Sequence, residues 1–229
     1  MVGIAVTGCD TLIGAKYRYR LTVEVETPEG MRTGSTVVEV KQWEAPAFPN
    51  PEAGGLRSSF RGEAVAVDLP GGQTLFVLLN TATTIAEYAY QPLVIGIKGP
   101  IERANAIKNT KLIAEVPIVG LTTEQASGQY RMSEASRYPI FVRFKDIRDR
   151  MTIKRVDPAN LSAAFGQGIS LRRMTVQITR DPISTDMTKR LPWLKTMRPG
   201  SFSEKNVRSF PLGLIDIVDT ASFSTEIPR

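Results

Sequence analysis

The chain has 229 residues, of which 42% are hydrophobic, a formal net charge of +6 and no histidine. Without histidine it lacks the commonest general base near neutral pH and the commonest transition-metal ligand, and its single cysteine excludes an internal disulfide and a thiolate zinc cluster. Basic residues alternate with acidic ones and form no long block, so the positive charge predicts no nucleic-acid partner.

The first segment with a chemical signature is VTGC, which consists of Val6, Thr7, Gly8 and Cys9. It resembles a bacterial lipobox, in which an aliphatic residue and two small residues precede the cysteine that receives a diacylglyceryl group. The small residues let the signal peptidase bind the extended chain closely. We therefore expect Cys9 to be the lipidation site and residues 1–15 to comprise a truncated signal, the lipobox and a tether.

The residues before this motif match a signal peptide only in part. MVGIAVTG contains no lysine or arginine and is shorter than a complete apolar signal core. The lipoprotein interpretation therefore requires a start codon farther upstream. In the alternative, the segment is a short first strand and Cys9 is an ordinary small apolar residue.

Residues 16–194 are expected to form one β-rich domain that begins with a hairpin. In YRYRLTVEVE, apolar and polar residues alternate, which predicts a strand with one buried face. TPEG supplies turn residues, and TGSTVVEV returns as the partner strand.

A second hairpin is expected from EAVAVDL, the turn PGGQ and the return strand TLFVLLN. The return strand is almost continuously apolar. Strands of this kind are typically covered on both faces, so we expect it to lie inside a sheet.

Between these hairpins, residues 43–61 read WEAPAFPNPEAGGLRSSFR, with three prolines and two glycines. This composition predicts a long surface loop, and long ordered loops are often functional. Trp43, Phe48 and Phe60 therefore form a candidate binding loop. The alternative is that these aromatic side chains pack over an edge of the core.

The remaining elements are less uniform. Further strands are expected in PLVIGI, YPIFVRFKDI and ISLRRMTVQIT, whereas residues 81–92 suit a helix or a strand and residues 101–116 suit a helix. DPANLSAAFGQG predicts a short helix capped by Asp157 and ended by Gly166. Residues 195–229 are expected to be a C-terminal extension that packs on the same domain.

These segments together predict a mostly β fold, either an antiparallel β-sandwich or an open barrel, with one or two short helices. Strand patterns recur along the chain, and the turns between them are rich in glycine and proline.

Two long segments carry a family resemblance. The stretch from YPIFVRFKDIRDR to DMTKRLPWL resembles the carboxy-terminal half of a proteobacterial family of uncharacterised, lipoprotein-like proteins, and YRYRLTVEVETPEGMRTGSTVVEV resembles their amino-terminal hairpin. The resemblance implies a cell-envelope setting. It implies no catalytic residue.

No phosphate-binding loop, dinucleotide fingerprint, nucleophile elbow or zinc-binding helix motif is present in the sequence. Carboxylates remain as candidates for acid–base or calcium chemistry, namely Asp146, Asp149 and Asp157, with Asp181 and Asp186 in DPISTD. Cations flank the first group and turn residues surround the second. Salt-paired, solvated turns are therefore the preferred interpretation, and no metal or other cofactor is expected.

The sequence thus favours a lipid-anchored cell-envelope protein on the periplasmic side, acting as a binding or structural accessory module. Its expected partners are the membrane, through the lipid anchor, and another envelope protein. Two alternatives stay open. A carboxylate-dependent envelope hydrolase requires two converging acids, one with a raised pKa, and a cytoplasmic or phage-derived assembly protein would need no signal.

Overall fold

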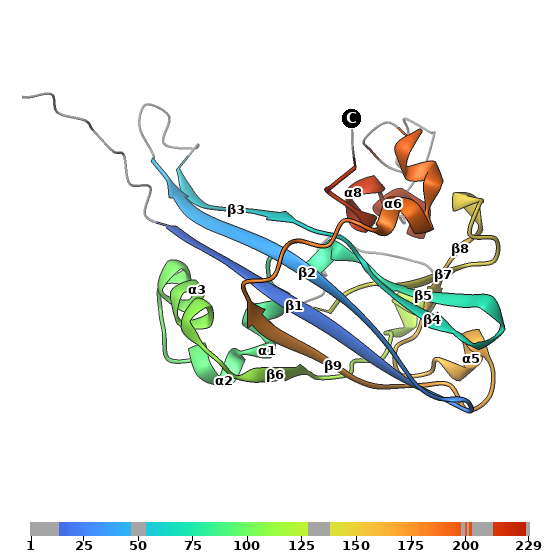
Figure 1. Ribbon diagram of the computed structural model, residues 1–229. Coiled ribbons are helices and arrows are strands. Elements are labelled where there is room, and N and C mark those ends of the chain that lie inside the picture. Colours follow the sequence, from blue (N-terminus) through green and yellow to red (C-terminus); the bar gives the residue numbers. More distant parts are fainter. Residues whose placement is uncertain are drawn as a thin grey trace, which may run out of the picture.

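The computed structural model describes residues 14–46, 54–127, 138–197, 200, 202 and 213–227, and its strands form two antiparallel sheets (Figure 1). The large sheet has the strand order β3-β2-β1-β9-β6 and the small sheet β4-β5-β7-β8. The strands are β1 (Gly14–Thr27), β2 (Gly30–Ala45), β3 (Gly55–Arg61), β4 (Val65–Leu69), β5 (Gln73–Val77), β6 (Ile113–Val116), β7 (Phe141–Phe144), β8 (Ile153–Val156) and β9 (Ser170–Thr179). Neither sheet closes on itself within these residues.

The first hairpin forms because period-two alternation gives β1 and β2 one apolar face each. Tyr19 lies opposite Val38, and on the other side of β1 it lies opposite Ile178 of β9. Tyr19 is 1% exposed, and its hydroxyl donates a hydrogen bond to the carbonyl of Ala82 at 2.8 Å. The inner face of the large sheet is therefore fixed to the segment that leads into the helices.

The second hairpin, β4 and β5, is also confirmed. Gly71 and Gly72 occupy its turn with φ values of 72° and 71°, a region that favours glycine. Leu75 and Val77 of β5 belong to the core between the sheets, whereas Phe76 belongs to a second core on the other face. Both faces of the return strand are covered, as its continuous apolar sequence predicts.

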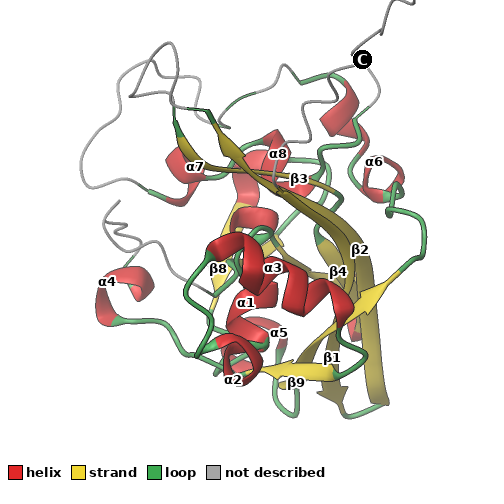
Figure 2. Cartoon of the chain, turned by 90° about the vertical axis from the view of Figure 1, so that its left-hand side faces the viewer, coloured by secondary structure: helices red, strands yellow, loops and turns green. Residues whose placement is uncertain are grey.

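Three helices cover part of the inner face of the large sheet (Figure 2). They are α1 (Ile85–Ala89), α2 (Gln91–Val94) and α3 (Pro100–Asn109). The strand expected in PLVIGI is wrong, because its first half is α2 and Pro92 occupies the first turn of that helix. Short helices are also more numerous than expected; the others are α4 (Thr123–Ala126), α5 (Ser162–Phe165), α6 (Met187–Arg190), α7 (Leu214–Ile217) and α8 (Thr220–Phe223).

The second core lies between the small sheet and the C-terminal helices. It joins Phe76 and Phe144 to Trp193, Phe202 and Phe223 through ring contacts with centroid distances of 5.4 to 6.0 Å. The small sheet is thus the middle layer of the described residues, with the large sheet on one face and the described residues of the 187–227 range supplying cover on the other.

Residues 62–64, between β3 and β4, form hydrogen bonds with residues near the end of the described chain. The backbone N–H of Ala64 donates to the carbonyl of Phe223 at 2.8 Å, and Gly62 exchanges hydrogen bonds with Thr225. Glu63, 2% exposed, accepts from the backbone N–H of Met187 at 2.9 Å and the hydroxyl of Ser224 at 3.1 Å. Burial raises the pKa of Glu63, and these hydrogen bonds offset part of that effect.

Two further boundaries differ from expectation. The long loop predicted for residues 43–61 is wrong at both ends, because β2 continues to Ala45 and β3 pairs with it from Gly55. The helix after Asp157 begins only at Ser162, although it ends at Gly166 as expected. The carboxylate of Asp157 instead accepts hydrogen bonds from the backbone N–H groups of Ala159 and Leu121. The mostly β antiparallel fold itself is confirmed.

Candidate functional site

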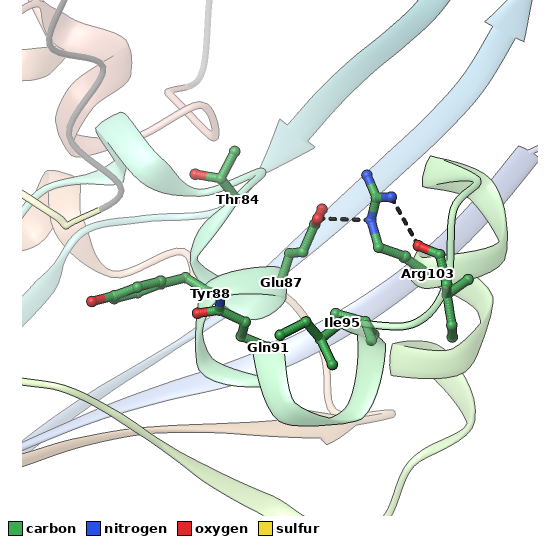
Figure 3. Close-up of a pocket in the computed structure, with 8 residues that line it drawn as sticks. Thr84, Glu87, Tyr88, Gln91, Ile95 and Arg103 are labelled. Carbon is green, nitrogen blue, oxygen red and sulfur yellow. Dashed lines mark hydrogen bonds and ion pairs between the residues drawn. The ribbon is translucent and has the colours of Figure 1, made fainter.

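A hollow among α1, α2 and the start of α3 is the candidate site (Figure 3). It has a volume of about 360 Å³, which lies in the usual range for small-molecule sites. Its lining residues are Thr84, Glu87, Tyr88, Gln91, Val94, Ile95, Ile97 and Arg103.

The helices place the polar side chains of this pocket from two directions. Glu87 projects from α1, and Arg103 projects from α3, which begins with Pro100 in its first turn (Figure 3). α1 lies against the large sheet, because Ile85 and Ala86 are buried in the core between the sheets. The nearby hydroxyl of Tyr17 has a raised pKa, chiefly through burial and further through the negative charge of Glu87.

An ion pair fixes the polar end of the pocket. Nε of Arg103 donates to Oε1 of Glu87 at 2.8 Å, and Nη1 donates to the carbonyls of Ile97 at 3.1 Å and Lys98 at 2.8 Å. The side chain of Arg103 is 25% exposed and that of Glu87 38% exposed. Within the described part of the chain Nη2 of Arg103 makes no hydrogen bond, so one donor group remains for a ligand.

Apolar side chains form another part of the lining. They are Val94, Ile95 and Ile97, and Ile95 is 79% exposed, the highest value among the large hydrophobic residues that the structure describes. Tyr88 and Gln91 add a hydroxyl and an amide (Figure 3). A fixed ion pair beside apolar side chains can bind a small amphipathic molecule, because polar groups orient a ligand while apolar contact supplies affinity.

The structure places Trp43 and Phe60 of the predicted binding loop on two different strands. Trp43 lies on β2, half-buried, with the ammonium group of Lys41 5.2 Å from its ring centroid. Phe60 lies on β3 and packs against the core between the sheets, which agrees with the alternative of aromatic packing at a core edge. Phe48 lies outside the described residues, as do Val6, Thr7, Gly8 and Cys9 of the lipobox.

The candidate carboxylates do not converge. Asp146 and Asp149 share the turn between β7 and β8, where each accepts a hydrogen bond at 2.9 Å from a backbone N–H two residues later. Asp181 accepts from Arg20 at 2.7 Å, and Asp186 pairs with Lys189. The described residues contain no group of three acids, histidines or cysteines suited to a metal.

The pKa values of Asp146, Asp181 and Asp186 are lowered, which is the wrong direction for a general acid. A hydrogen bond from the backbone of Arg148 lowers the pKa of Asp146, and one from the hydroxyl of Thr179 lowers that of Asp181. General acid catalysis needs a carboxyl group with a raised pKa. The hydrolase alternative therefore gains no support from the positions of these residues.

The fold and the pocket together define an antiparallel β-sandwich with a small-molecule-sized hollow in its helical cover. Comparisons with family models, with curated proteins and with solved structures found no match. Among the described residues no helix is long and apolar enough to span a bilayer.

Proposed function

We propose that this protein is a lipid-anchored cell-envelope protein that acts as a binding module and takes its ligand in the pocket between α1 and α3. The observation that carries the binding role is the arrangement of that pocket. Arg103, which keeps one donor group without a partner in the described residues, and apolar side chains line the same hollow, while the carboxylates of the hydrolase alternative lie apart.

The position of the first strand supports an anchor at Cys9. β1 begins at Gly14, five residues after Cys9, and five extended residues span at most about 18 Å. A lipid on Cys9 would thus hold the Gly14 end of the large sheet close to the bilayer.

The side chains at this end of the sheet suit such a location. Gly14 pairs with Trp43, and Trp43 pairs with Arg57 on its other side. Lys41 lies beside the Trp43 ring. Tryptophan is favoured at the headgroup level of membranes, and cations are attracted to anionic lipids.

The polar groups of the pocket favour an uncharged head group in the ligand. Glu87 and Arg103 neutralise each other, so a charged ligand would meet repulsion from one of them at close range. A hydroxyl or amide can instead donate to the carboxylate and accept from the guanidinium. The preferred ligand is therefore a small amphipathic molecule with a hydroxylated or amide-bearing head.

Lipidation is tested by labelling the expressed full-length protein, including any upstream export signal, with a radioactive fatty acid. Label is expected on the wild-type chain and is expected to be lost in Cys9→Ala, because the thiol is the acceptor. Thr7→Ala keeps a small residue within the lipobox and should still be labelled. Equal label with and without Cys9 would rule out this anchor.

Ligand binding is tested with octyl glucoside below its critical micelle concentration, followed by amide chemical shifts in NMR spectra. Saturable shifts are expected at Tyr88, Gln91 and Ile95, with affinity reduced roughly 10-fold or more in Ile95→Glu, because a charge replaces an apolar side chain of the lining. Leu56→Glu, at a residue 48% exposed on β3, is the matched control and should bind as the wild type does. Unsaturable shifts, or equal affinity in Ile95→Glu, would refute the pocket as the site.

A further inference from the structure

The large sheet ends in an open strand edge at β6. β6 pairs with β9 through Ile113–Gln177 and three further residue pairs, and it is the last strand in the sheet order. Figure 1 shows it at the lower margin of the sheet, outside β9. An open edge presents unpaired backbone N–H and carbonyl groups, which can pair with another strand.

Large apolar side chains gather at this edge. Leu112 is 61% exposed and Ile113 is 63% exposed. The hydroxyl of Tyr90 lies 2.7 Å from the carbonyl oxygen of Leu112 and 3.0 Å from that of Val176, so it holds the start of β6 beside β9. The edge is therefore ordered before any partner arrives, which lowers the entropy cost of pairing.

We propose that two copies of this chain associate through β6, which pairs antiparallel with β6 of the second copy to make one continuous sheet. The argument rests on the sequence TKLIAEV at residues 110–116. In a two-fold pairing centred on Ile113, this residue meets its own copy, and Lys111 lies opposite Glu115 of the second copy. The symmetry makes this charge pair twice, as an isologous interface requires.

Neighbouring registers lose this complementarity. A pairing centred on Ala114 would place Ile113 opposite Glu115 and bring Pro117 into the ladder, where it cannot donate a hydrogen bond. A pairing centred on Leu112 would place Lys111 opposite Ile113. Only the Ile113 register of these three matches apolar with apolar and acid with base.

Lys111 and Glu115 are available for this role. Both are exposed and, among the residues described, neither forms an ion pair. Ile113 and Glu115 lie opposite Gln177 and Thr175 of β9, on the outer face of the sheet. Arg173 also lies on this face, where it pairs with Glu24 at 2.8 Å and feels the charge of Glu115.

The test is sedimentation velocity of the full chain carrying Cys9→Ser, which removes lipid attachment and adventitious disulfides. A concentration-dependent species of twice 25.2 kDa is expected. Ile113→Lys should sediment as a monomer, because two like charges would meet on the symmetry axis. Met31→Lys, at a residue 48% exposed on β2, is the control and should still dimerise.

Charge-reversal variants distinguish the proposed Ile113 register from any other mode of association. Lys111→Glu and Glu115→Lys alone should each weaken dimerisation about 2- to 30-fold, and the double variant should restore it.

In the same Cys9→Ser chain, Ile113→Cys should be cross-linked to a dimer by a short bis-maleimide, whereas Met31→Cys should not. A monomer at every concentration, a dimer indifferent to Ile113→Lys, or no restoration in the double variant would overturn the proposal. None of these results depends on the pocket or on the lipid anchor.

Discussion

Replacing Phe223 with alanine is expected to lower the free energy of unfolding by roughly 3–5 kcal/mol. Phe223 is 0% exposed and contacts four aromatic rings of the second core, with Phe202 stacked at 5.8 Å and Phe76 edge-on at 5.9 Å. Truncation would remove these contacts and leave a cavity that rigid neighbours cannot fill. Urea denaturation followed by circular dichroism measures the change.

The comparison variant is Phe60→Ala, because Phe60 is only partly buried against the other core. Its loss in unfolding free energy should be clearly smaller than that of Phe223→Ala. A loss below about 1 kcal/mol for Phe223→Ala, as small as that of an average substitution, would contradict the central place of this ring.

Gly34→Ala is expected to destabilise the protein by about 1–3 kcal/mol or more, although it adds only one methyl group. An ideal Cβ at Gly34 would lie 2.2 Å from the carbonyl oxygen of Ala66 and 2.9 Å from Cγ2 of Val67. β2 and β4 belong to different sheets and are in close contact here, so the methyl group would force the sheets apart. The loss should appear in both thermal and urea unfolding.

Gly96→Ala provides the matched control. A Cβ at Gly96 would meet no atom within 4 Å, and its φ lies outside the region that favours glycine. The same chemical change should there be neutral or slightly stabilising, because alanine restricts the unfolded chain. Equal effects at Gly34 and Gly96 would show that the sheets tolerate a wider separation.

The sequence was most informative where one periodicity governed a whole segment. The alternation around Tyr19 predicted β1, and the apolar run around Phe76 predicted a strand covered on both faces; both are confirmed. The sequence was misleading where the local composition indicated a loop but the backbone pairs with a neighbouring strand. Prolines suggested a loop around Trp43, but the backbone pairing of β2 with the polar edge strand β3 extends to Ala45.

The strand expected in PLVIGI failed for a related reason. Six apolar residues without clear periodicity are compatible with a strand or a buried helix. Pro92 lacks an N–H, which a helix tolerates in its first turn, and Val94 is buried beside α1 and α3 in the core between the sheets. Tertiary packing decided between the two structures, and no local signal reports it.

The pocket could not be predicted from sequence. Glu87 and Arg103 lie 16 positions apart, in no recognised motif, and meet only because α1 and α3 pack against each other. The exposure of Ile95 could not be predicted either, because an isoleucine in a sequence is normally interpreted as a core residue. The predicted acids, in contrast, lie in separate turns, where each has a cation or a backbone N–H within a few residues or across a strand.

The attachment of residues 62–64 to residues 223–225 has a consequence for biosynthesis. The partners Glu63 and Ser224 lie 161 positions apart. At typical synthesis rates, roughly 10 to 30 seconds separate their emergence from the ribosome. During that interval Phe76 lacks part of its cover, so we expect the incomplete chain to expose an apolar aromatic surface until α8 has been synthesised.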